Sequence, residues 1–217
     1  MTDPVAPGRE KLVETKQRWA QEGRLLTGVA ADPATRLPPG QRLVTDFPVL
    51  DLGVQPDIAR AKWHLRVDGL VANQLILDWS AFEDIATAEF TNDIHCVTAW
   101  SRYDNRWRGV GVQALLDLAQ PAAEASHVVL HSYDGYTTNL GLDAFARAKN
   151  LVATHWNGAP LERVHGGPAR LVVPHLYFWK SAKWLSRIEF VAEDRPGFWE
   201  VRGYHNNADP WAEERYD

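Results

Sequence analysis

The sequence contains a single cysteine, Cys96, among its 217 residues, and this scarcity limits what the thiol can do. One thiol cannot form a disulfide within the chain, so Cys96 must serve packing, nucleophilic chemistry or ligation of a soft metal. A lone cysteine agrees with a reducing compartment without requiring one. Zinc sites need several cysteine, histidine or carboxylate ligands at short spacing, and the sequence shows no recognisable set of that kind.

A strong charge of one sign and a long apolar run are missing as well. The net charge is -5, and the mixed order of acidic and basic residues leaves no basic stripe to neutralise the phosphates of a nucleic acid. No stretch approaches the roughly eighteen apolar residues of a membrane-spanning helix, and the N-terminal segment has neither the apolar core of a secretory signal nor a twin-arginine pair. We therefore expect no nucleic-acid partner, no membrane span and a cytoplasmic location.

Three common catalytic motifs are absent: the chain has no GxSxG, no GxxxxGK[ST] and no GxGxxG. A Cys–His hydrolase stays open, because the fold can bring His155 or His165 to Cys96. What the chain does have is apolar content, at 45%, and ten tryptophans. That content is ample for a buried core, and tryptophans beside charged residues often line a pocket, although each one taken alone is more typical of core packing.

The periodicity of the sequence predicts a mixed α+β fold, rich in strands, with short helices. Residues 28–60 contain five prolines and are expected to be irregular. The expected helices are an amphipathic one over 9–26, a short one capped by Ser80 with Glu83, and two more over 109–121 and 142–149. The expected strands include a hairpin over 61–79, a strand over 88–97, and strands within 127–142, 151–156, 170–174 and 185–191.

Cys96 follows a predicted strand and precedes an arginine-rich stretch, which we interpret as a loop. Arg102, Arg106 and Arg108 all lie within it. Guanidinium groups close to a thiol stabilise its charged form, so this setting predicts a thiolate that attacks or ligates. Burial as a small apolar residue is the competing interpretation, and for a lone cysteine it is about as common.

Residues 165–184 combine a glycine pair with five basic or titratable side chains. The glycines permit close approach of a ligand to the backbone, and the side chains suit an anion such as phosphate. These side chains are His165, Arg170, His175, Lys180 and Lys183. A tight turn followed by a solvated strand face would give the same pattern.

Several motifs taken together resemble the molybdopterin-binding domain of the sulfite oxidase family. They are "DIHCVTAWS" followed by "RWRGV", then "SYDGYTTNLGL", "LVATHWNGAPL", "HGGPARLVVPHLYFWKSAKWLSRIEF" and "WEVRGYHNNADPW". The chain is most similar to the short bacterial sulfite-oxidase-like oxidoreductases. The similarity runs from about residue 38 to the end, so it implies an N-terminal arm and helix over 1–37 and a single domain over 38–217. The family fold is mixed α+β, in agreement with the periodicity.

The resemblance implies molybdenum with molybdopterin as cofactor and Cys96 as the metal ligand, a role that suits a thiolate sulfur. It also implies two sets of contacts to the organic part of the cofactor. His165 and Arg170 match the family's pterin-contacting pair, and Ser181 and Lys183 fall in its phosphate- and pterin-binding loop. Asp46 and Phe47 lie in "TDFPVL", which is similar to the segment that passes over the cofactor.

Two family hallmarks of sulfite binding are missing, since Val44 stands where an arginine is expected and Val201 where a tyrosine is. Arg102, Tyr103 and His175 are our candidates for replacing them as catalytic residues. The implied activity is oxygen-atom transfer, as sulfite-type oxidation or as reduction of an S-oxide or N-oxide, with a small oxyanion or oxide as substrate and a separate electron-transfer partner. A non-catalytic molybdopterin-binding protein and a metal-free cysteine enzyme remain alternatives.

Overall fold

The computed structural model describes residues 9–22, 29–30 and 36–217. The predicted N-terminal helix is present as α1 (Glu10–Glu22). The predicted helix extended to residue 26, and its last part, with Leu25 and Leu26, lies outside the described residues. The same is true of residues 1–8, 23–28 and 31–35, which belong to the predicted arm and to the start of the irregular segment.

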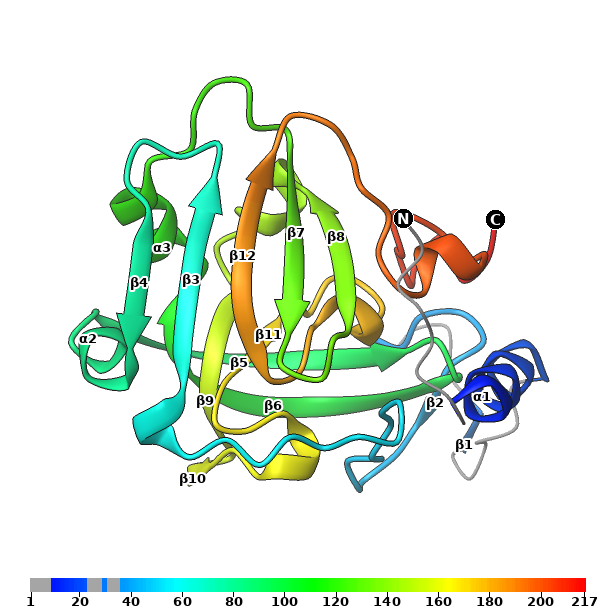
Figure 1. Ribbon diagram of the computed structural model, residues 1–217. Helices are drawn as coiled ribbons and strands as arrows, with labels where there is room; N and C mark the ends of the chain where they lie inside the picture. Colours follow the sequence, from blue (N-terminus) through cyan, green and yellow to red (C-terminus); the bar gives the residue numbers. More distant parts are fainter. Residues whose placement is uncertain (1–8, 23–28, 31–35) are drawn as a thin grey trace.

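Two β-sheets make up the body of the molecule, with few and short helices (Figure 1). The seven-stranded sheet contains β1 (Val29–Ala30), β2 (Arg42–Leu43), β5 (Thr87–Cys96), β6 (Trp100–Gly111), β9 (Leu151–Trp156), β10 (Ala159–Pro160) and β11 (Arg170–Val172). The five-stranded sheet contains β3 (His64–Gly69), β4 (Leu75–Asp78), β7 (His127–Ser132), β8 (Thr137–Gly141) and β12 (Leu185–Val191). The other helices are α2 (Trp79–Glu83), α3 (Val112–Ala119) and α4 (Leu142–Phe145), with 3-10 turns η1 (Arg60–Lys62), η2 (Arg163–His165), η3 (Phe178–Lys180) and η4 (Glu200–Arg202). The predicted strand-rich α+β class is confirmed.

Both sheets join strands that are far apart in the sequence. The five-stranded sheet has the order β4-β3-β12-β7-β8, in which β3 and β12 run parallel and the other neighbours antiparallel. In the seven-stranded sheet β6 is central: β5 and β9 pair with it antiparallel, and β2 pairs with it parallel. The long β5–β6 hairpin therefore carries its tight turn, and Cys96 with it, to one end of the sheet.

The arginine-rich stretch after Cys96 is a strand, so the predicted loop is wrong. Strand β6 begins at Trp100 and pairs with β5 from Cys96↔Trp100 to Thr87↔Val110. Its side chains alternate, with Asn105 and Trp107 buried while Arg106 and Arg108 are exposed. Alternation of buried and exposed positions is the signature of a half-buried strand, and the high charge of its outer face is what made this segment look like a loop.

Three helix predictions need correction at their ends. The cap of α2 is Asp78, whose Oδ1 accepts a hydrogen bond from Ala81 N at 2.8 Å, and not Ser80. Helix α3 begins at Val112 and not at Gly109, because β6 continues to Gly111. Gly109 packs tightly against β9, where an added Cβ would lie 2.0 Å from the carbonyl oxygen of Val152. Helix α4 ends at Phe145, several residues earlier than predicted.

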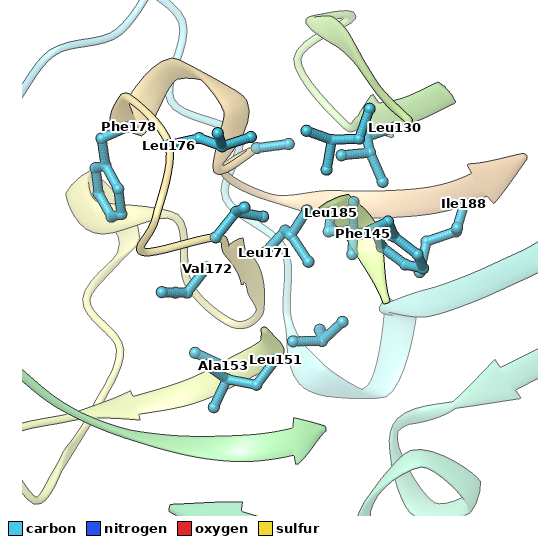
Figure 2. Close-up of a cluster of buried hydrophobic side chains, with 14 of the residues drawn as sticks. Leu130, Phe145, Leu151, Ala153, Leu171, Val172, Leu176, Phe178, Leu185 and Ile188 are labelled. Carbon is cyan, nitrogen blue, oxygen red and sulfur yellow. The ribbon is translucent and has the colours of Figure 1, made fainter. Parts of the chain in front are cut away.

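The hydrophobic core fills the space between the two sheets. Figure 2 shows Leu151 and Ala153 of β9 facing Leu185 and Ile188 of β12, with Phe145 of α4 beside them. All five side chains are completely buried. Burial of large apolar side chains stabilises the fold by about 1.5–3 kcal/mol each. This apolar layer therefore holds the two sheets against each other.

Candidate functional site

A cavity of about 930 Å³, counted with the part that is open to solvent, lies at the end of the β5–β6 hairpin. Its wall brings together Cys96, aromatic rings and charged side chains from segments that are distant in the sequence. Concave sites that combine apolar walls with a few polar and charged groups are where small molecules and cofactors bind. Six of the predicted site residues line this cavity: Phe47, Cys96, His165, Arg170, Ser181 and Lys183.

Cys96 is fixed in the cavity wall by the hairpin. It is the last residue of β5, and the turn that follows ends at Ala99, whose φ of 67° lies in the left-handed region. The carbonyl oxygen of Cys96 accepts hydrogen bonds from Ala99 N and from Nε2 of Gln41, both at 3.0 Å. Its sulfur lies 3.2 Å from Oγ1 of Thr98. The thiol therefore has a defined, buried position in the wall of the cavity.

The predicted electrostatics of this thiol are wrong. Burial raises the pKa of Cys96, and the hydrogen bonds of Thr98 and the charges of Arg215 and Lys16 oppose that rise only in part. The arginines of β6 are not the source of positive charge, because the strand carries their side chains away from the turn. In the protein alone the neutral thiol is therefore favoured, and a thiolate here needs a further positive charge such as a metal.

His165 and Phe47 form a flat stack at the cavity. Their ring centroids are 4.1 Å apart and their planes differ by 3°. Burial and the charges of Arg170 and Lys183 lower the pKa of His165 to about 4, so its imidazole is neutral at neutral pH. A neutral imidazole has one donor and one acceptor nitrogen and suits a polar heterocycle better than an anion.

Arg170 organises the base of the cavity. Its guanidinium is buried and donates from Nη1 to the carbonyl oxygen of His165 at 2.8 Å and from Nη2 to that of Ser181 at 2.7 Å. The hydroxyl of Ser181 accepts from Val173 N at 2.9 Å. Burial lowers the pKa of Arg170 to about 9, which still leaves it charged at neutral pH. These bonds tie the two ends of residues 165–181 into one rigid unit.

Lys183 adds a second positive charge beside Arg170. Its Nζ donates to the carbonyl oxygen of Val164 at 2.8 Å and lies 4.0 Å from Oδ2 of Asp51. Burial, together with the charge of Arg170, lowers the pKa of Lys183 to about 7. The repulsion between two partly buried cations is relieved when an anion binds between them, so this corner of the cavity favours an anion.

The structure does not bring the other predicted residues to the cavity. Lys180 is fully buried in an ion pair with Glu200, with Nζ 2.7 Å from Oε1. Of the predicted catalytic residues, Arg102 has its guanidinium over the ring of Trp156, and Tyr103 has the guanidinium of Arg36 over its ring; neither residue lines the cavity. The two remaining residues, Asp46, which is exposed, and His175, also lie outside the wall.

Several wall residues were not predicted. Lys16 and Trp19 come from α1, Asp51 from the irregular segment, and Tyr204 from the C-terminal segment. The β7–β8 hairpin contributes three more, which are Ser132, Asp134 and Tyr136. The hairpin residues lie inside "SYDGYTTNLGL", a motif that carried the resemblance, and that signal pointed to them. Lys16 and Trp19 lie outside every motif, so only the docking of α1 reveals them.

The donor set of the cavity fits a molybdopterin better than a metal held by protein alone. Among the described residues, no group of three or more His, Cys, Asp or Glu side chains is placed to hold a metal ion. An ion at Cys96 would therefore need most of its ligands from another molecule. Two polar atoms of the wall, Nε1 of Trp100 and Oγ of Ser132, are buried without a hydrogen-bond partner among the described residues. Orphaned polar atoms beside a cationic corner fit a large polar ligand.

The known proteins that are similar to this chain carry names of oxidoreductases. The family model "oxidoreductase molybdopterin binding domain" matches residues 52–199. The uncharacterized oxidoreductase YuiH of Bacillus subtilis (strain 168) is 47% identical over 187 residues, which cover 86% of this chain and 94% of that protein. The methionine-sulfoxide reductase catalytic subunits MsrP of Gluconobacter oxydans (strain 621H) and Burkholderia mallei (strain ATCC 23344) are 29% and 26% identical, each over 68% of this chain.

The coverage of these relatives differs. This chain spans 54% and 51% of the lengths of the two MsrP proteins. A similar solved structure is the sulfane dehydrogenase SoxCD from Paracoccus pantotrophus, with a TM-score of 0.59 and 18% identity over 64% of this chain and 40% of that one. At this identity the likeness shows the fold. No described helix has both the length and the apolar character needed to cross a membrane.

Proposed function

We propose, since the chain belongs to the family of the oxidoreductase molybdopterin-binding domain, that the sulfur of Cys96 is the protein ligand of molybdenum and that the protein transfers an oxygen atom to or from a small substrate. The observation that carries this proposal is the position of Cys96. The one thiol of the sequence lies in the wall of a cavity, at the tip of a hairpin, with Arg170 and Lys183 in the same wall.

The broader assignment is a molybdopterin-binding oxidoreductase of the sulfite oxidase type, with molybdenum and molybdopterin as its cofactor. When bound, that group supplies the two-electron chemistry of oxygen-atom transfer. The chain's own residues hold the group, orient the substrate and limit the access of water. Burial of the Cys96 sulfur serves the last of these tasks, because it shields the metal-binding position from bulk solvent.

Five wall residues, in and near the rigid unit of residues 165–181, are proposed to hold the organic part of the cofactor. Arg170 and Lys183 supply the charge for a phosphate, and Ser181, whose carbonyl oxygen Arg170 binds, lines the same wall. The neutral ring of His165, held flat by Phe47, is a polar partner for the heterocycle. Support comes from the geometry: all five side chains face one cavity, although Phe47 lies more than a hundred residues before the others.

Reduction of an S-oxide is the direction that we favour. The MsrP relatives are named for the reduction of methionine sulfoxide, and their similarity extends over most of this chain. The position at which the sulfite-binding arginine was expected holds Val44, which is buried and lies outside the cavity wall. With that arginine missing, the site lacks a group that the resemblance implies for sulfite, and this favours an S-oxide over sulfite. An N-oxide has the same polarity and stays a second candidate.

A metal-free cysteine enzyme fits the site less well. Such an enzyme needs a base that hydrogen-bonds the thiol. Among the described residues, the Cys96 sulfur has Thr98 as its hydrogen-bond partner, and no histidine reaches it. His155 contacts Arg108 and Thr154 and lies outside the wall, while the ring of His165 is stacked on Phe47. A raised thiol pKa also works against a nucleophile.

The partner, the location and the domain limits remain proposals. The sequence has no haem-binding motif, so we propose that electrons reach the site from a separate carrier. A single domain over 38–217, preceded by an arm, remains the proposed division of the chain, and the cytoplasm remains the proposed location.

The experiment that tests the function is a substrate panel on the metal-loaded protein, with reduced viologen dye for reduction and ferricyanide for oxidation. We expect viologen-dependent turnover of methionine sulfoxide or dimethyl sulfoxide, weaker or no turnover of sulfite, and about one molybdenum per chain. Loaded protein that turns over none of these substrates would support the non-catalytic alternative. Protein that never retains molybdenum or pterin, yet reacts readily with thiol reagents, would support the cysteine enzyme.

A further inference from the structure

Helix α1 is docked against the body at the mouth of the cavity. Val13 is buried, and Leu12 packs at Gly53, where an added Cβ would lie 3.0 Å from Cδ2 of the leucine. Nε2 of Gln17 donates to the carbonyl oxygen of Arg202 at 3.3 Å. Figure 1 shows α1 on the side of the molecule where β5 ends and where the C-terminal segment lies. The helix therefore contacts both the irregular segment and the end of the chain.

One face of α1 forms part of the cavity wall. Lys16 and Trp19 are three residues apart, so they share a helix face, and both line the cavity. Lys16 is half-buried, and burial lowers its pKa while the charges of Asp51 and Cys96 raise it. Within the part of the chain that the structure describes, its ammonium has no hydrogen-bond or ion-pair partner. In this it differs from Lys180, which Glu200 neutralises, and from Lys183, which donates to Val164.

The charge of the whole wall is consistent with an anion at Lys16. The wall contains three cationic side chains, Lys16, Arg170 and Lys183, against two carboxylates, Asp51 and Asp134. Burial raises the pKa of Asp134, one of these two carboxylates. Nζ of Lys16 is not among the fully buried polar atoms that lack a partner in the described residues, so it can donate hydrogen bonds to a ligand that enters the cavity.

We propose that Lys16 donates hydrogen bonds to an anionic group bound in the cavity, so that α1 is a part of the site and not only a surface helix. The anion has two candidate sources, the phosphate of molybdopterin and an oxyanion of the substrate near Cys96. Because both sources belong to the proposed function, this inference rests on it. Lys16 shares the cavity wall with Cys96 and with Asp51, the carboxylate that lies 4.0 Å from Nζ of Lys183, so an anion from either source would bind in the cavity that Lys16 lines.

The test compares Lys16→Gln with Lys11→Gln, which removes the same charge from an exposed position of the same helix, and with Lys16→Arg, which keeps the charge. Two quantities are measured on metal-loaded protein: the molybdenum and pterin retained after dialysis, and the dissociation constant for sulfate, a non-reacting oxyanion, by calorimetry. If the anion is the cofactor phosphate, Lys16→Gln loses cofactor faster than wild type. If it is a substrate oxyanion, retention is unchanged and the sulfate dissociation constant rises by roughly 10-fold or more, the effect of one charge-assisted hydrogen bond.

Either result supports the proposal, provided that Lys11→Gln behaves as wild type and Lys16→Arg recovers most of the effect. Equal retention and equal sulfate binding in Lys16→Gln and Lys11→Gln would overturn it. Failure of the proposed function looks different, because the wild-type protein would then hold no molybdopterin. In that case titration of inorganic phosphate into wild type and Lys16→Gln still tests Lys16, and equal affinities would again overturn the inference.

Discussion

The two sides of the cavity are built in different ways. On one side, Arg170 donates to the carbonyl oxygens of His165 and Ser181, so residues 165–181 form a buried, hydrogen-bonded unit. On the other side, the described contacts of α1 include the packing of Val13 and Leu12 and a side-chain hydrogen bond from Gln17. A tightly held side suits a cofactor that stays bound, and a lightly held side suits a ligand that comes and goes.

The largest effect is expected at the sulfur that lies between the two sides. Cys96→Ser replaces sulfur by an oxygen of similar size, so the fold should survive, but the proposed metal ligand is lost. We expect turnover of loaded protein to fall at least about 100-fold, since even changes to groups behind a metal ligand cost 10- to 100-fold. Thr98→Val, which removes only the hydrogen bond to the sulfur, serves as a milder control. Steady-state kinetics at matched molybdenum content measure both, and full activity of the serine variant would remove Cys96 from the mechanism.

The next largest effect is expected at the buried ion pair between Lys180 and Glu200, in which Lys180 belongs to residues 165–181. Lys180→Met leaves Glu200 buried without its cation, and breaking one partner of a buried pair costs about 3–5 kcal/mol of unfolding free energy. The double variant Lys180→Met with Glu200→Leu should recover much of that loss, because no charge then remains buried. Urea unfolding monitored by tryptophan fluorescence measures the difference. A double variant less stable than the single one would show that the pair itself, and not the stranded charge, is what matters.

A smaller effect is expected from pH, through Lys183. Its pKa is about 7 in the folded protein against 10.5 in the unfolded chain, so the unfolded state binds more protons between these values. The stability of cofactor-free protein should therefore rise with pH across that window, while its affinity for inorganic phosphate should fall, because the cation is lost. His165, with a pKa of about 4, does not titrate there.

Lys183→Met is the control for this pH effect, measured by urea unfolding and by phosphate titration at several pH values between about 6 and 10. It should flatten both dependences. If the wild type and this variant keep the same slopes, then Lys183 is not the titrating group.

The smallest effect concerns the lightly held side. Val13→Ala removes apolar contact from the buried face of α1, and we expect a local loss of about 1 kcal/mol in docking, with little change in global unfolding. Hydrogen exchange of α1 amides should rise relative to wild type while the amides of β9 and β12 keep their protection. Equal rises in all three elements would mean that α1 is part of the cooperative core, and the contrast between the two sides would be lost.

Local patterns were sufficient to predict much of the fold. β9 and β12 begin and end where alternation and turn residues placed them, and the Asn157–Gly158 pair forms the tight turn between β9 and β10 with φ values of 49° and 86°. The same patterns failed at β6, where a charged outer face hid the alternation of Asn105 and Trp107.

The site was less predictable than the fold, because its wall is assembled from distant segments. Residues inside long motifs, such as Arg170 and Lys183, could be found from the resemblance. The position of Lys16 depends on how α1 docks, which no local pattern encodes. Lys180 and Lys183 stand three residues apart with opposite environments, one sealed in an ion pair and one in the cavity wall, and the sequence alone does not separate them.

The most direct test of the central claim is X-ray absorption at the molybdenum edge, on wild type and Cys96→Ser loaded to the same metal content. Our account predicts one sulfur neighbour fewer around molybdenum in the serine variant, with the remaining sulfur shell unchanged. An identical number of sulfur neighbours in the two proteins would show that Cys96 does not bind the metal and would contradict the account.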